Sequence, residues 1–177
     1  MKKLICLIMA LALVCSLAAC GSSGGNTEGT TPNNGSGNAS TNTTEPGYTF
    51  TYNGTKIAMN VDAADILSAL GEPKRYTEEA SCAFTGLDKT YDYGSFYLQT
   101  YPDGDKDFVY GIWFADDGVN TEEGVYIGME QAQVESIYGA ESYNGSNAYI
   151  LTKGVCKLTV IITDGVVSSV QYDAIVS

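Results

Sequence analysis

Ile57–Gly71 reads IAMNVDAADILSALG, and Val125–Gly139 reads VYIGMEQAQVESIYG. The two segments align at a constant offset, and each ends in glycine, a residue common at helix C-termini. Their shared positions have the spacing of a short amphipathic helix. The matched pairs are Val61/Met129, Ala64/Ala132, Ile66/Val134 and Leu70/Tyr138. The sequence therefore predicts an internal repeat in which the halves contain helices over 62–70 and 129–138.

Alternating apolar and polar residues follow each predicted helix and indicate antiparallel strands. A β-hairpin is expected before the first helix, because Asn53-Gly54 favours the positive φ angles of a tight hairpin turn. The strands are predicted at 81–85, 91–101 and 108–114 in the first half, and at 148–152, 155–163 and 166–173 in the second. We therefore expect an α+β fold of two tandem repeats, about 47–117 and 118–177, each with a short helix and antiparallel strands forming a sheet.

This order of elements resembles the two-repeat fold of the β-lactamase-inhibitor-protein type and of the related small lipoproteins of the SmpA/OmlA kind. Residues 127–139 carry the resemblance, since Gly128, Met129, Val134 and Gly139 match that family's Gly-Met-x-x-x-x-Val-x-x-x-x-Gly helix. The first half departs from the pattern, with Asn60 where glycine is expected. The resemblance implies protein–protein contact as a broad role and implies no catalytic residues.

The N-terminus has the three parts of a bacterial export signal. Lys2 and Lys3 supply positive charge, and residues 4–17 are almost wholly apolar. This run is shorter than the roughly 20 residues of a membrane-spanning helix. The sequence Leu17-Ala18-Ala19-Cys20 follows and resembles the bacterial lipobox. The resemblance implies that residues 1–19 are a signal peptide, that cleavage falls between Ala19 and Cys20, and that the Cys20 sulfur carries a diacylglyceryl group.

Residues 21–46 consist mainly of Gly, Ser, Asn and Thr and contain no aliphatic side chain larger than alanine. Such a segment cannot bury enough apolar surface to offset the entropy of ordering. It is therefore expected to be a disordered tether between the lipidated Cys20 and a globular domain at 47–177. Its composition resembles the tethers of Gram-positive surface lipoproteins. We expect an extracytoplasmic protein held to the cell membrane by its lipid.

The chain is strongly acidic and contains no histidine. It has nine Lys plus Arg residues and 21 Asp plus Glu residues, and its net charge is −12. Such a surface repels nucleic acid. The absence of histidine excludes Ser-His-Asp and Cys-His catalysis and also histidine-ligated zinc. We therefore expect no enzymatic activity, no cofactor and no nucleic-acid partner.

Tyrosines are concentrated on one side of the predicted strand 91–101. Phe96 and Leu98 occupy the alternate positions and should meet the helices, so the tyrosines should point outward. Tyrosine is enriched at binding surfaces, but cross-strand tyrosine pairs also stabilise a half-exposed sheet. The candidate binding face consists of Tyr91, Tyr93, Tyr97 and Tyr101, with Tyr110 on a neighbouring strand.

Two further groups of residues have candidate roles. Cys82 and Cys156 both share strand parity with apolar residues and should point inward, so either a disulfide or two buried thiols is expected. Asp103, Asp105 and Asp107 alternate in the manner of calcium ligands, but Phe108 stands where an EF-hand loop requires glycine. We expect a charged hairpin tip there and no metal site.

Two functions fit these expectations. The favoured one is a non-enzymatic surface lipoprotein that binds a protein or peptide through its tyrosine face. The alternative is a lipoprotein that binds a small ligand or glycan through the same aromatic face. A broad sheet surface would favour the first, and a deep pocket would favour the second.

Overall fold

A computed structural model describes residues 47–176 of the chain. The predicted signal peptide, the lipid attachment site at Cys20 and the tether lie outside the described residues.

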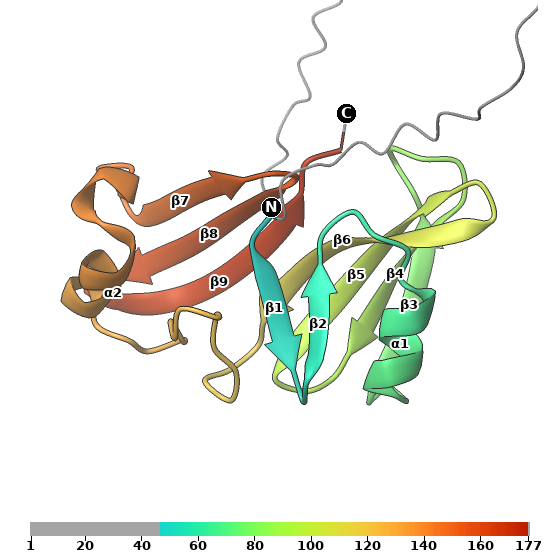
Figure 1. Cartoon of the computed structure of the whole chain (residues 1–177), viewed down its shortest axis with the longest axis horizontal. Helices are drawn as coiled ribbons and strands as arrows, with labels where there is room; N and C mark the ends of the chain where they lie inside the picture. The colour runs from blue at the N-terminus through green and yellow to red at the C-terminus, as the bar shows by residue number, and fades with distance from the viewer. Residues whose placement is uncertain (1–46, 177) are drawn as a thin grey trace, which may run out of the picture. The chain divides into compact units, whose positions relative to one another are not determined.

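The described residues form nine strands, two α-helices and a 3₁₀ turn (Figure 1). The elements in chain order are β1 (Thr49–Tyr52), β2 (Thr55–Ala58), α1 (Ala64–Leu70), β3 (Arg75–Ala80), β4 (Leu87–Asp92), β5 (Phe96–Asp103), β6 (Lys106–Phe114), α2 (Gln131–Tyr138), η1 (Ala140–Ser142), β7 (Ala148–Lys153), β8 (Cys156–Thr163) and β9 (Val166–Ala174). Strands β1 and β2 pair only with each other, and the other seven form one antiparallel sheet in the order β3-β4-β5-β6-β9-β8-β7.

The expected α+β fold of tandem helix–strand repeats is wrong. Strands make up 48% of the structure and helices only 14%, so the fold is mostly β. The first helix is followed by four strands rather than three, because Arg75–Ala80 forms an edge strand whose residues are all exposed. An edge strand with so little burial lacks the apolar alternation by which strands are recognised in a sequence. The two helices also differ, since α1 buries no residue and α2 buries Val134 and Tyr138.

The hairpin predicted at Asn53-Gly54 is confirmed. Both residues have positive φ angles, 48° and 84°, as a two-residue hairpin turn requires. The hairpin packs on the sheet through Phe50 and Ile57, which are fully buried. The Phe50 ring centre lies 5.0 Å from that of Phe96 on β5.

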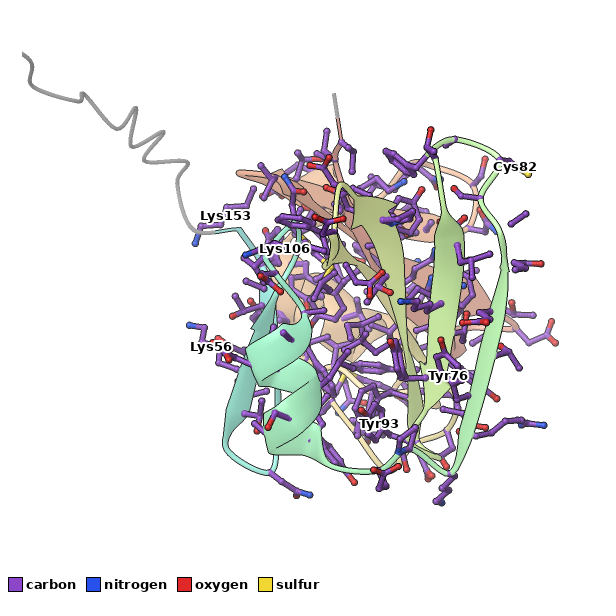
Figure 2. The ribbon with its side chains drawn as sticks, turned by 90° about the vertical axis from the view of Figure 1, so that its right-hand side faces the viewer. Lys56, Tyr76, Cys82, Tyr93, Lys106 and Lys153 are labelled. Atoms are coloured by element: carbon purple, nitrogen blue, oxygen red, sulfur yellow. The ribbon has the colours of Figure 1, made fainter. Side chains whose placement is uncertain are left out.

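One side of the seven-stranded sheet carries the hydrophobic core. Its central side chains include Leu98, Ile112 and Tyr172, all fully buried. Within residues 47–176 the hairpin, α1 and α2 contribute to this same core, and Figures 1 and 2 show the hairpin and α1 on one side of strands β3–β6. No helix of residues 47–176 covers the opposite side of the sheet.

Strand β6 joins β9 at the centre of the sheet, and Gly111 makes this junction possible. A Cβ atom at Gly111 would lie 2.9 Å from the backbone oxygen of Tyr172, closer than a side chain can approach. Gly111 pairs in register with Asp173. A glycine at this position thus connects the two halves of the sheet into one surface.

The strand predicted at 91–101 is instead two strands joined by a turn. Gly94 has a φ of 96°, and its N–H donates to Oδ1 of Asp92 at 2.8 Å. The N–H of Tyr93 donates to the backbone oxygen of Phe96 and closes the turn. The alternation of side chains therefore restarts after Gly94, which changes the faces assigned to the tyrosines.

The strand predicted at 81–85 is a loop. Oγ of Ser81 accepts hydrogen bonds from the backbone N–H groups of Ala83 and Phe84, which holds the segment in a turn. Serine side chains commonly compete in this way with strand pairing. The loop, residues 81–86, connects β3 to β4 and carries Cys82, which is labelled in Figure 2.

Candidate functional site

The uncovered side of the seven-stranded sheet is called the open face below. Two rows of side chains cross it, as the strand registers show, and most of these side chains are partly exposed. The first row is Arg75, Asp92, Tyr97, Trp113, Gln171, Thr159 and Ile150. The second row is Thr77, Thr90, Gln99, Gly111, Asp173, Lys157 and Thr152. A flat surface of this kind, polar with aromatic side chains near its centre, is typical of a recognition face.

Tyr97 and Trp113 form the aromatic centre of the open face. They are directly paired across β5 and β6, and both are partly exposed. Trp113 is the only tryptophan of the chain. Its Nε1 atom is buried and has no hydrogen-bond partner within the described residues. Because Nε1 is buried, the part of Trp113 that a partner can contact is its exposed ring surface.

Two of the five tyrosines predicted to form the binding face lie on the core side of the sheet instead. Tyr91 pairs with Leu98 and packs against the core. Tyr93 is 8% exposed, stacks on Phe96 at a ring distance of 5.1 Å, and donates its hydroxyl to the backbone oxygen of Gly71. The turn at Gly94 is the reason, because it breaks the strand on which the prediction relied.

Tyr97, Tyr101 and Tyr110 do lie on the open-face side, but not as an exposed row. Tyr101 is only 6% exposed, because Phe84 of the β3–β4 loop covers it at a ring distance of 4.5 Å. Tyr110 is 37% exposed and meets the Tyr101 ring edge-on. The pairing of β5 with β6 shifts between Gln99 and Thr100, and this bulge leaves Tyr110 as the unpaired residue of β6.

Most charged groups of the open face are paired with one another. Arg75 contacts Asp92 at 2.8 Å and Lys157 contacts Asp173 at 3.3 Å. The hydrogen bond from Arg75 lowers the pKa of Asp92, and the N–H of Gly94 lowers it further. In both pairs the basic side chain is largely exposed to solvent, so the pairs contribute little to the free energy of unfolding. The two pairs keep the face polar, and the positive and negative charges within each pair cancel.

A small cavity lies at one end of the open face, where the β3–β4 loop folds over β5. We call it the loop pocket. Its volume is about 150 Å³. It is lined by Glu79, Cys82, Ala83, Phe84, Asp88, Gln99, Thr100, Tyr101 and Tyr110. Asp88 is the notable member, since its Oδ1 atom is buried and has no hydrogen-bond partner in the part of the chain that the structure describes.

No family model, curated protein or solved structure matches this chain. The geometry of the described residues therefore carries the functional argument. Within residues 47–176, neither α-helix is long and apolar enough to cross a membrane.

Cys82 and Cys156 do not form a disulfide. Cys82 is exposed in the β3–β4 loop, and Cys156 is buried at the start of β8. The expectation that both point inward is wrong for Cys82, because residues 81–86 are a loop rather than a strand. Burial raises the pKa of the Cys156 thiol to about 12, so this thiol stays protonated and unreactive at neutral pH.

The three alternating aspartates lie around the β5–β6 turn, as expected of a hairpin tip. Asp103 and Asp105 are exposed, and Asp107 accepts a hydrogen bond from Nζ of Lys89 at 2.7 Å. In the described residues no group of three or more acidic or cysteine side chains is placed to hold a metal ion.

Sequence reasoning missed Trp113, Glu79 and Asp88. Trp113 falls on a correctly expected strand, and its alternation with the buried Ile112 and Phe114 was a signal that could have placed it outward. Glu79 and Asp88 had no such signal. They lie opposite each other in the β3–β4 pair, whose extent the sequence did not reveal.

Proposed function

We propose that this chain is a non-enzymatic, lipid-anchored surface protein that binds a protein or peptide partner through the open face of its sheet. The single observation that carries this proposal is a seven-stranded sheet that has one side uncovered by any helix of residues 47–176, with Tyr97 and Trp113 paired at its centre. Tyrosine and tryptophan are the side chains most enriched at protein-binding hot spots. The lipobox-like residues Leu17-Ala18-Ala19-Cys20 support the membrane anchor.

The shape of the face favours a macromolecular partner over a small ligand or glycan. Small-molecule sites usually enclose about 300–1,000 Å³. The loop pocket, at about 150 Å³, is smaller than that range. A broad polar sheet surface with partly exposed aromatic rings instead fits a flat partner surface or an extended peptide.

Site-specific photo-crosslinking in intact cells of the source organism tests the proposal. A photoreactive phenylalanine replaces Tyr97 on the open face. In a matched control it replaces Ile137, which is exposed on α2, a helix that packs on the other side of the sheet. We expect a defined protein adduct from position 97 and none from position 137.

Second-site variants show whether the adduct depends on the face itself. Trp113→Ala and Thr159→Arg, each combined with the photoreactive residue at position 97, should abolish the adduct while circular dichroism shows a folded domain. Thr159→Arg adds a long side chain to the first row without removing a buried group. Equal adducts from positions 97 and 137, or an adduct that survives both variants, would contradict the proposal.

A further inference from the structure

The loop pocket holds two carboxylates that have no cation. Glu79 on β3 and Asp88 on β4 are directly opposite in the strand register. Neither takes part in an ion pair among the described residues. Oδ1 of Asp88 is buried without a hydrogen bond. Both residues line the pocket, and a carboxylate without a positive partner pairs favourably with a positively charged ligand.

Three aromatic rings also line the pocket, those of Phe84, Tyr101 and Tyr110. The rings of Phe84 and Tyr101 lie 4.5 Å apart, and Tyr110 packs edge-on against Tyr101 at 6.1 Å. The Tyr101 hydroxyl is already used, since it donates to Oδ1 of Asn60, so this residue contributes its ring rather than its polar group. Aromatic rings attract cations through their negative faces, which suits the same ligand as the carboxylates.

No lysine or arginine of residues 47–176 lines the loop pocket. Lys89 is the neighbour of Asp88 in sequence, but its Nζ contacts Asp107 at 2.7 Å. In Figure 2, the labelled Lys56, Lys106 and Lys153 lie on the side of the hairpin, away from Cys82 on the loop that borders the pocket. Residues 47–176 therefore supply no positive group to the pocket, and a ligand would have to supply it.

We propose that the loop pocket binds the guanidinium group of an arginine side chain on the peptide or protein that occupies the open face. A cavity of about 150 Å³ admits a single side-chain head group. A guanidinium pairs with carboxylates through several N–H groups and stacks on aromatic rings, whereas an ammonium does not stack. The inference rests on the proposed function, because it names the partner residue that would lie at the loop end of the open face.

Protection of Cys82 from alkylation tests the proposal with the full chain in detergent. Cys82 lines the pocket and is exposed, so its modification by iodoacetamide can be followed by mass spectrometry of the peptide that contains it. N-acetylarginine methylamide should slow this modification in a saturable manner. The citrulline analogue, which is neutral and nearly the same shape, should require at least about tenfold higher concentration.

Paired variants assign the effect to the pocket. Asp88→Asn should raise the concentration of the arginine compound that gives half-protection by about tenfold or more. Asp65→Asn removes the same charge from an exposed site on α1 and should leave that concentration within about twofold. Tyr110→Ala, at an exposed position, should also weaken protection.

Several outcomes would overturn the inference. They are no protection by the arginine compound, equal protection by the citrulline analogue, or equal losses of protection in the Asp88→Asn and Asp65→Asn variants. These outcomes are separate from failure of the proposed function. A protein adduct at position 97 without Cys82 protection would contradict the arginine pocket alone, and protection without an adduct would contradict the open face as a partner site.

Discussion

Tyr97 and Tyr101 lie four residues apart on β5 and face the same side of the sheet, yet their surroundings differ. Tyr97 is partly exposed beside Trp113. Tyr101 is enclosed by Phe84 and Tyr110 and is 6% exposed. The first ring is therefore free for recognition, and the second contributes to the fold.

This difference predicts opposite effects of two alanine substitutions. Tyr101→Ala should lower the free energy of unfolding by about 3–5 kcal/mol, because it removes a buried ring and leaves a cavity. Tyr97→Ala should lower it by less than about 1 kcal/mol and should weaken partner binding instead. Urea unfolding followed by circular dichroism measures both. Equal losses in the two variants would mean that the open face is covered near Tyr97.

One buried cysteine and two buried tyrosines should make the free energy of unfolding fall at alkaline pH. Burial raises the pKa of Cys156 from 9.0 to about 12, and burial also raises the pKa of Tyr172 and Tyr138 well above the ordinary value of 10.0. Each group holds its proton longer in the folded state than in the unfolded state. Above pH 9 the unfolded chain therefore binds fewer protons than the folded chain, and stability falls as pH rises.

The urea concentration that unfolds half of the protein should fall steadily between pH 9 and pH 11. These three groups contribute no pH dependence at pH 6–8, where they are protonated in both states. Replacing Cys156 by alanine should flatten the first part of the decline, near pH 9–10. A wild-type midpoint that stays constant up to pH 11 would show that these groups ionise as easily in the folded protein as in the unfolded one.

The two helices differ in how firmly they are attached. α2 begins with a capping box between Glu130 and Gln133 and buries Val134 and Tyr138. α1 has seven residues and buries none of them fully. Short helices depend on tertiary packing for their stability, so α1 has the weaker support.

Native-state hydrogen exchange should reveal this difference. The amides of α1 should exchange at least about tenfold faster than those of α2, because local opening of α1 exposes no fully buried side chain. The amides of β9, which is paired on both sides by β6 and β8, should be the slowest. If the amides of α1 exchange as slowly as those of β9, α1 is not a weakly attached element.

The β3–β4 loop shapes the open face at the level of elements. It folds over Tyr101 and turns the end of a flat sheet into a pocket. The bulge in β6 acts at the same place by bringing Tyr110 against Tyr101. Both features are local departures from regular strand pairing, and both fall where recognition is proposed.

At the scale of the whole molecule, the proposed anchor and the open face have separate tests. Cys20→Ala should abolish lipid attachment and release the protein from the membrane fraction. Labelling of cells with a radioactive fatty acid measures the attachment. The substitution should leave the melting temperature unchanged, because the predicted tether at 21–46 separates Cys20 from the predicted domain at 47–177. Label that persists on the Cys20→Ala variant would contradict lipidation at this residue.

The sequence by itself determined the elements whose signals are local. The Asn53-Gly54 hairpin, the three strands of the second half and the positions of both helices were predicted to within about two residues, because turn residues and alternation are read over short distances. The strong negative charge and the lack of histidine also follow from the sequence alone.

Only the tertiary structure decided the fold class and the composition of the site. The exposed edge strand β3 carries no apolar alternation, so the number of strands in the first half was hidden. The turn at Gly94 and the bulge opposite Gln99 each reset the alternation of faces, and a loop covers Tyr101. Which rings are buried depends on such nonlocal contacts, since alternation assigns a face only while a strand continues without interruption.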